Sequence, residues 1–290
     1  MAVLQRSRRK LLFDLLPAGL HSLADAQPGV AGGVRLISPD VAEFDGRISS
    51  RFAQLVDWEG YPQFKKFMAF IQHDGTVKAK AYCVVWVFQL GDGRQRSIRA
   101  HYIHKHLMPK ISVRTLESGS ERLISPFFNI SATDFKAHPN HAAIKIPPNF
   151  PFQDAEVLSV SIDAVIYSDG SVAGQDKYDL RTRYIGTRNA EHDEAFLLLR
   201  ELSKPTSTPD SLHADSILEK HFQAGIDAVR TYSQDWKKQF YVRALGQEAA
   251  IMRNVLSTRG LNALKANALR RIRFPQTIVS PVGQSDEPSA

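Results

Sequence analysis

The stretch Thr76–Leu90, with the sequence TVKAKAYCVVWVFQL, decides the fold class of this chain of 290 residues. One set of alternate positions is apolar from Val77 to Val87, whereas the other set begins with Lys78 and Lys80 and turns apolar only after them. Alternation with a period of two is typical of a β-strand. The pattern therefore predicts a strand that is exposed on one face at its start and buried on both faces at its end.

Three Asp-Gly dipeptides punctuate the region around this strand, at residues 74–75, 92–93 and 169–170. Asp tolerates a positive φ and Gly adopts it without strain, so each pair predicts a tight hairpin turn. Strand-like stretches flank the turns at residues 64–72, 76–90, 95–104 and 157–167, with a further candidate at 142–146 and two within 107–131. About seven strands without an intervening helical pattern favour an antiparallel sandwich or barrel.

We expect an α+β chain whose β domain is an antiparallel β-sandwich of immunoglobulin-like or fibronectin-like architecture. The support is architectural, because Cys83 is the only cysteine and the Cys…Trp…Cys spacing of true immunoglobulin domains is lacking. Four segments are predicted along the chain: an N-terminal helix and irregular arm over 1–46, the β domain over 47–186, a basic helical segment over 187–275 and a disordered tail over 276–290.

The helical segment is predicted from apolar residues spaced three and four positions apart. Asn189 is expected to cap its first helix, and Ser203–Pro205 to end it. A long apolar stripe over residues 218–256 follows, and Thr258–Gly260 interrupts it before a last stripe that ends ahead of Pro275. We expect these stripes to pack against one another or against the sheet.

The N-terminus carries competing signals. Ser7-Arg8-Arg9 resembles a twin-arginine export signal, which would span residues 1–26 and end at a small-residue cleavage site. Asp14 and Pro17 interrupt its apolar stretch. The alternatives are a docked amphipathic helix over residues 4–16, or an arm that is disordered or binds an anionic membrane surface. A cytoplasmic location is the first expectation and export is the alternative.

Positive charge is concentrated near the C-terminus. The chain has a formal net charge of +7 and a pI of about 9.5. Residues 236–274 contain nine basic residues and one acid, Glu248, so the rest of the chain is close to neutral. Arg270, Arg271 and Arg273 are suited to contact phosphates. An anionic partner, either nucleic acid or an anionic membrane, is therefore the alternative to a protein partner, and residues 236–274 are where it would bind.

Histidines form the densest group of side chains with metal-binding chemistry. On an extended strand His104 and His106 would share one face and His101 would lie on the other. A predicted loop carries two more, His138 and His141. Histidine is the commonest metal ligand, but zinc needs three or four ligands in tetrahedral array. The spacing matches no zinc signature, so exposed or hydrogen-bonded histidines are expected, and neither a metal nor a cofactor is predicted.

Three carboxylates, Asp163, Asp169 and Asp176, crowd the segment DAVIYSDGSVAGQD. Paired carboxylates can do acid–base chemistry or bind calcium, but the spacing is not that of a calcium-binding loop and a turn already accounts for Asp169. No nucleophile elbow, phosphate-binding loop or metalloprotease motif is present in the sequence. Catalytic residues are therefore unassigned.

A non-enzymatic binding or protein-interaction protein is the first functional expectation, with a protein as its partner. One alternative is a hydrolase or metal-dependent enzyme with loop-borne residues around His101–His106. The other is a protein that binds an anionic polymer or a membrane surface through the basic helices of residues 236–274. The fold class alone does not decide among the three, because one fold hosts many functions.

Overall fold

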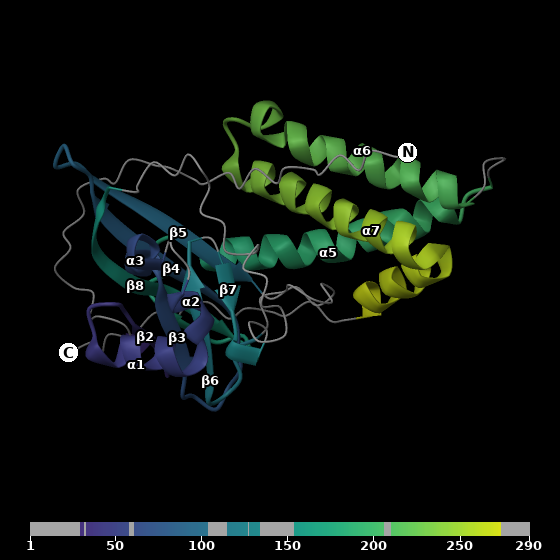
Figure 1. Ribbon diagram of the computed structural model, residues 1–290. Helices are drawn as coiled ribbons and strands as arrows, with labels where there is room; N and C mark the ends of the chain where they lie inside the picture. The colour runs from purple at the N-terminus through teal and green to yellow at the C-terminus, as the bar shows by residue number, and fades with distance from the viewer. Residues whose placement is uncertain are drawn as a thin grey trace, which may run out of the picture. The chain divides into compact units, whose positions relative to one another are not determined.

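The computed structural model of the chain describes residues 30–31, 33–57, 61–103, 115–126, 128–133, 154–205 and 210–273. Over these residues the protein is α+β, with two antiparallel sheets followed along the chain by three long helices (Figure 1). The predicted export signal or docking helix, the strand candidate at 142–146 and the predicted C-terminal tail lie outside the described residues.

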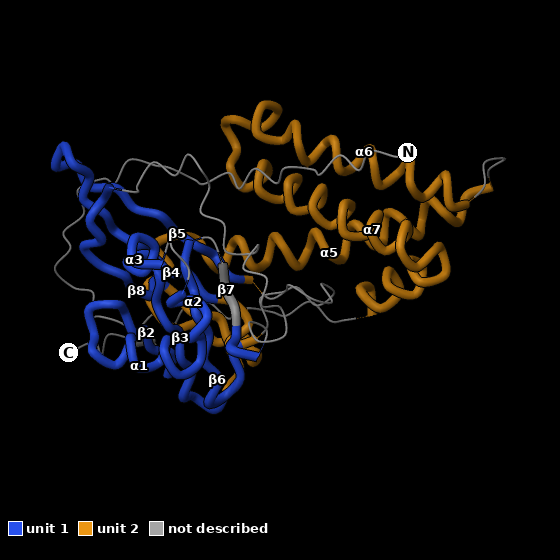
Figure 2. The backbone as a smooth tube through the Cα atoms, in the orientation of Figure 1, with its two compact units in different colours: residues 1–76, 82–102, 116–163 blue, residues 77–81, 103–115, 164–290 orange. Residues whose placement is uncertain are grey.

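The chain forms two compact units, which Figure 2 draws in blue and orange. The first unit contains residues 1–76, 82–102 and 116–163, and the second contains residues 77–81, 103–115 and 164–290. The three long helices therefore belong to the second unit.

The first sheet is centred on β3. Its strand order is β1 (Val30–Ala31), β2 (Val34–Ile37), β3 (Ala69–His73), β6 (Ser120–Ser125) and β7 (Phe128–Ile130), and all neighbouring pairs are antiparallel. Phe70 and Ile71 are adjacent in β3, face opposite sides of the sheet and are both completely buried. Both faces of β3 are therefore covered. The two strands expected within residues 107–131 are confirmed as β6 and β7.

Four short helices separate β2 from β3: α1 (Ala42–Arg51), α2 (Ala53–Val56), α3 (Tyr61–Phe64) and the 3₁₀ helix η1 (Lys65–Phe67). Phe44 of α1 packs on Phe70 of β3, with ring centroids 5.2 Å apart, and Phe52 packs on the same ring at 5.8 Å. These aromatic contacts hold the helices on the sheet.

The helices correct two expectations for this region. The irregular arm expected up to residue 46 is wrong for the described residues after Val30, and the strand expected at 64–72 begins only at Ala69. The reason is amphipathic spacing: Phe44 and Ile48 are one helical turn apart and both are buried. This apolar stripe outweighs the local preference of the glycines and prolines for irregular structure.

The second sheet contains the stretch that decided the fold class. Its strand order is β5 (Gln95–Ile103), β4 (Ala79–Gln89), β8 (Glu156–Tyr167) and β9 (Val172–Gly174). The predicted change of exposure along β4 is confirmed, since Lys80 is partly exposed and residues 82–86 are all buried. In β8, Asp163 is buried, because the strand is covered on both faces from that residue on.

Two of the three Asp-Gly pairs form the predicted hairpins. Gly93 has a φ of 78° and lies between β4 and β5, which are neighbours in the second sheet. Gly170 has a φ of 89° and lies between β8 and β9, which pair antiparallel. In both places the positive φ is the conformation for which glycine is suited.

The hairpin predicted at Asp74-Gly75 is wrong. β3 precedes this pair and β4 follows it, but the two strands belong to different sheets. The backbone N–H of Asp74 donates to the carbonyl of Gly33 at 2.8 Å, and β3 pairs with β2 and β6. The turn chemistry is local, whereas strand pairing depends on burial of the whole sheet.

Three long helices end the described chain: α5 (Leu180–Leu202), α6 (Asp210–Thr231) and α7 (Trp236–Arg273). Gly260, with φ 79° and ψ 177°, breaks α7 where the sequence predicts an interruption. The expected cap at Asn189 is wrong, because α5 starts at Leu180, where the Asp176 carboxylate accepts the backbone N–H. None of the helices in the described ranges is long and apolar enough to cross a membrane.

A single apolar core joins the three helices. Its buried members come from all three and from both parts of α7: Ala195, Leu198, Ala214, Leu218, Ala249, Met252, Val255, Leu264 and Ala268. The predicted packing of the apolar stripes on one another is confirmed. At the crossing of α6 and α7, a Cβ added to Gly225 would lie 2.7 Å from Cα of Gly246, so the two backbones are in direct contact.

Candidate interaction surface

The histidine hypothesis is only partly covered by the described residues. His101 lies on β5 and is partly buried. His104, His106, His138 and His141 lie outside the described residues. Within the ranges that the structure describes, no group of three or more His, Cys, Asp or Glu side chains is arranged to hold a metal ion. An enzyme with residues around His101–His106 therefore stays a prediction.

Two of the three crowded carboxylates have structural roles. Asp169 accepts hydrogen bonds from the backbone N–H and hydroxyl of Ser171, and these bonds lower the pKa of its carboxyl. Asp176 accepts the N–H groups of Leu180 and Arg181 at the start of α5, although burial raises the pKa of its carboxyl. These contacts close a turn and cap a helix.

The basic residues of α7 are partly neutralised by acidic residues of α6. Arg253 forms two hydrogen bonds to Asp215 of α6, at 2.8 and 3.2 Å, and also binds Glu219. Lys265 lies 3.0 Å from Asp210 at the start of α6. Arg253 and Lys265 of α7 are therefore paired with acidic residues of α6.

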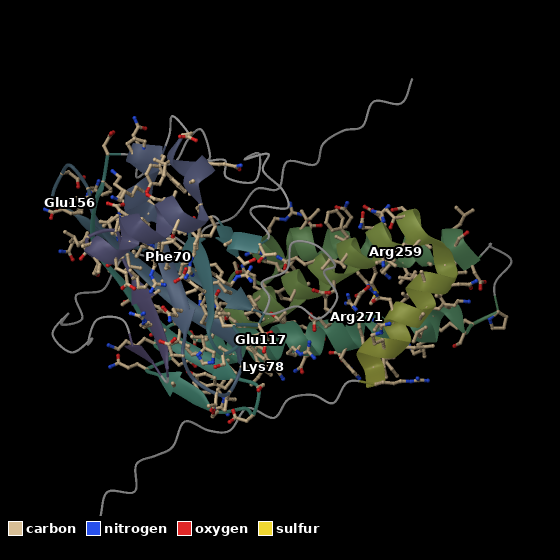
Figure 3. The ribbon with its side chains drawn as sticks, turned by 60° about the horizontal axis from the view of Figure 1, so that its bottom comes forward. Phe70, Lys78, Glu117, Glu156, Arg259 and Arg271 are labelled. Atoms are coloured by element: carbon tan, nitrogen blue, oxygen red, sulfur yellow. The ribbon has the colours of Figure 1, made fainter. Side chains whose placement is uncertain are left out.

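Glu248, the one acid of the segment, neutralises another cation. Its carboxylate accepts a hydrogen bond from Arg271 at 2.7 Å, and the two side chains are 1% and 4% exposed. Arg259 and Arg271 lie on either side of the break in α7 (Figure 3). Because Arg271 is buried in this pair, the prediction that it contacts a partner's phosphates is wrong.

Six basic residues of α7 have no ion pair within the described part of the chain. We divide them into two groups: Lys237, Lys238 and Arg243 near its start, and Arg259, Arg270 and Arg273 from the break onward. All but Arg243 are exposed. The positive charge available to a partner therefore lies near the start of α7, at its break and at its end.

The first group lies at a turn that we name the helical tip, residues 226–243, which comprises the end of α6 and the start of α7. Trp236 opens α7, and the guanidinium of Arg183 from α5 lies 5.5 Å from its ring centroid. The same guanidinium lies 5.2 Å from the ring centroid of Phe240. Cation–π contacts of this kind hold the indole in one orientation.

Backbone and side-chain contacts also hold the turn in place. Asp235 caps α7, because its carboxylate accepts the backbone N–H of Lys238 at 2.9 Å. The ammonium of Lys238 lies 4.6 Å from the ring centroid of Tyr232. The side-chain amide of Gln239 donates to the carbonyl of Val229 at 3.1 Å, which ties α7 to the end of α6. These contacts fix the backbone that carries Lys237 and Lys238.

The helical tip also exposes large apolar side chains. Ile226 is 56% exposed and Val229 is 42% exposed, and they lie one turn apart on α6. Trp236 is 39% exposed although Arg183 stacks on it. A tip that combines exposed aliphatic, aromatic and cationic side chains has the composition of an interaction surface.

The second basic group borders an open groove at the end of α7. Its described lining residues are Ala266, Leu269, Arg270 and Arg273. Leu269 is 46% exposed. The groove presents two guanidinium groups beside one large apolar side chain, and its described lining has no aromatic residue.

Partly buried polar contacts connect the three helices. His221 of α6 contacts the carboxylate of Glu194 of α5 at 2.9 Å. Tyr241 of α7 donates its hydroxyl hydrogen bond to Asp193 of α5, and burial is the largest cause that raises the pKa of this phenol. These contacts position α5 against α6 and α7.

The sequence indicated the basic residues of this surface but not its geometry. Arg183 lies within the range expected to be β domain, so its contact with Trp236 was not foreseeable from spacing. The apolar spacing of Val229 and Trp236 pointed to core surface, yet both side chains are substantially exposed. Comparison with known proteins found no match among family models, curated proteins or solved structures.

Proposed function

We propose that this chain is a binding protein whose helical segment engages an anionic partner. The observation that carries the proposal is the distribution of ion pairs along α7. Arg253 and Lys265 are neutralised by acids of α6. Exposed Lys237 and Lys238 at one end of α7, and Arg270 and Arg273 at the other, have no such partner in the described chain. Exposed cations without counter-charges create a positive potential that attracts anions.

The same proposal gives the β domain a supporting role as an antiparallel sandwich of immunoglobulin-like or fibronectin-like type. One contact within the first unit supports a sandwich. The hydroxyl of Tyr102 on β5 donates to the carbonyl of Ser125 on β6 at 2.5 Å, so the two sheets meet there. Phe67 of η1 packs on Phe88 of β4 with ring centroids 5.6 Å apart, so the 3₁₀ helix also contacts the second sheet. A non-enzymatic role for the whole chain is part of this proposal.

Binding to three anionic probes tests the proposal. The full-length protein is titrated with a DNA duplex, with phosphatidylglycerol vesicles and with polyglutamate, each at low and high salt. We expect saturable binding to at least one probe, weakened by salt because released counterions drive it. Reversing Lys237, Lys238, Arg270 and Arg273 to Glu should weaken that binding by about tenfold or more.

A matched control separates a specific surface from net charge. Arg200 and Lys204 are exposed cations at the end of α5, and each lies beside Glu201. Reversing both to Glu should leave binding within about twofold of the unmodified protein, because Glu201 already offsets part of their charge. Absence of binding to all three probes at low salt would contradict the proposed function.

A further inference from the structure

We infer that the partner of the helical tip is the surface of an anionic lipid bilayer. The inference rests on the proposed function and names its partner class. The contact is made by the helical tip, residues 226–243. Its cations bind the headgroups, and its apolar side chains enter the interface.

The positive charges of the helical tip are suited to contact anionic headgroups. Lys237 and Lys238 are exposed and have no ion pair in the described part of the chain. The carboxylate of Asp235 caps the helix that carries them. Lysines beside a membrane surface are attracted by the negative potential of anionic headgroups, over about one Debye length. The tip therefore presents its charge where phosphate-bearing headgroups would lie.

The indole of Trp236 is suited to the membrane–water interface of a bilayer. Tryptophan is enriched at membrane–water interfaces because its ring is apolar and its N–H is polar. Arg183 lies against the Trp236 ring at 5.5 Å, which holds the ring at the surface while 39% of the residue stays exposed. An ordered, exposed indole loses little conformational freedom when it enters the interface.

The aliphatic residues distinguish lipid from nucleic acid. Ile226 and Val229 are exposed on the last turns of α6. Phosphates offer them no apolar partner and base edges offer only the thymine methyl group, whereas the boundary of the acyl chains offers a continuous apolar layer. Among the described residues, the second basic group around Arg270 and Arg273 has only Leu269 as an exposed large apolar neighbour, so we assign the lipid contact to the tip and not to the groove.

Vesicle flotation with the full-length protein tests the inference. The unmodified protein should float with vesicles of phosphatidylcholine mixed with phosphatidylglycerol and should stay behind with phosphatidylcholine alone. The double variant Lys237→Glu/Lys238→Glu should lower the partition coefficient by about tenfold or more. Ile226→Ser/Val229→Ser should lower it by about threefold or more, because the apolar contribution is lost.

Two control variants carry the same change of charge elsewhere. Arg270→Glu/Arg273→Glu alters the second basic group, and Arg8→Glu/Arg9→Glu alters the basic N-terminus. Both should keep most of the vesicle binding, and circular dichroism should show that every variant is folded. If either control abolishes binding while the tip variants retain it, the tip is not the lipid-binding surface and the inference is overturned.

Tryptophan quenching by brominated lipid gives an independent readout. The chain contains three tryptophans, Trp58, Trp86 and Trp236. The quenching that disappears in Trp236→Phe reports on the tip, and it should be the larger part of the total. Binding to DNA or polyglutamate without binding to vesicles would overturn this inference and leave the proposed function standing. Absence of binding to every probe would overturn both.

Discussion

The Nδ1 atom of His221 lies 2.9 Å from both carboxylate oxygens of Glu194, and the Glu194 side chain is completely buried. The hydrogen bond to Glu194 raises the pKa of His221 above its usual 6.5. Burial raises the pKa of Glu194, and the hydrogen bond to His221 opposes that rise. This pair joins α5 to α6, so the protonation of one imidazole is coupled to the packing of two helices.

The stability of the helical segment should fall as the pH rises above neutrality. A raised pKa for His221 means that the folded protein binds its proton more tightly than the unfolded chain. That stabilisation is complete below about pH 6.5 and is lost as the pH rises through the higher pKa of the folded state. Thermal unfolding should show a decrease in Tm of roughly 3 °C between about pH 6 and pH 9.

The variant His221→Gln identifies the source of this pH dependence. Other charges near the pair are Lys220, Glu201, Glu248 and Arg271, and they remain in the variant. Its Tm should therefore vary less with pH above 6 than that of the unmodified protein. An unchanged pH profile would assign the dependence to another group.

Removing one partner of the Glu248–Arg271 pair should destabilise the protein strongly. Both side chains are almost completely buried, so Arg271→Leu removes the guanidinium that neutralises the buried carboxylate of Glu248. The expected loss is about 3 kcal/mol in the free energy of unfolding, measured by urea denaturation. The double variant Glu248→Leu/Arg271→Leu should recover most of that loss, because the buried charge is gone. Equal losses in the single and double variants would contradict this account.

Gly225→Ala should destabilise the crossing of α6 and α7. The added methyl group would lie 2.7 Å from Cα of Gly246, and backbone atoms cannot move aside as a flexible side chain can. We expect a loss of about 2–3 kcal/mol in urea denaturation. Gly46→Ala in α1 is the matched control, because nothing lies within 4 Å of its added Cβ. The control should be neutral or slightly stabilising, since alanine favours helix over glycine.

Tyr102→Phe should weaken the contact between the two sheets. The phenol is buried, its burial raises its pKa well above the usual 10, and its hydroxyl donates to the carbonyl of Ser125. Removing this donor should cost about 1–2 kcal/mol in the free energy of unfolding. Tyr232→Phe removes a hydroxyl from a partly exposed ring and should change stability by less than about 0.5 kcal/mol. Similar losses in both variants would argue against a specific role for Tyr102.

Local sequence patterns were sufficient to predict the structural features that depend on residues close together in the chain. The alternation in residues 76–90 predicted β4 and its change of exposure, and the Asp-Gly pairs before Arg94 and Ser171 predicted two hairpins. The apolar stripes predicted that the later helices share a core. Local sequence carries this information because the two periods, 2.0 and 3.6, place successive side chains on defined faces.

The sequence by itself determined the α+β class, the hairpins at Gly93 and Gly170, and the concentration of basic residues near the C-terminus. Only the tertiary structure decided which of those basic residues remain available. Arg253 is neutralised by Asp215, 38 positions away, and Lys265 by Asp210, 55 positions away. Such pairs form because α6 and α7 pack closely side by side, and charge compensation follows distance in space, which no local pattern in the chain encodes.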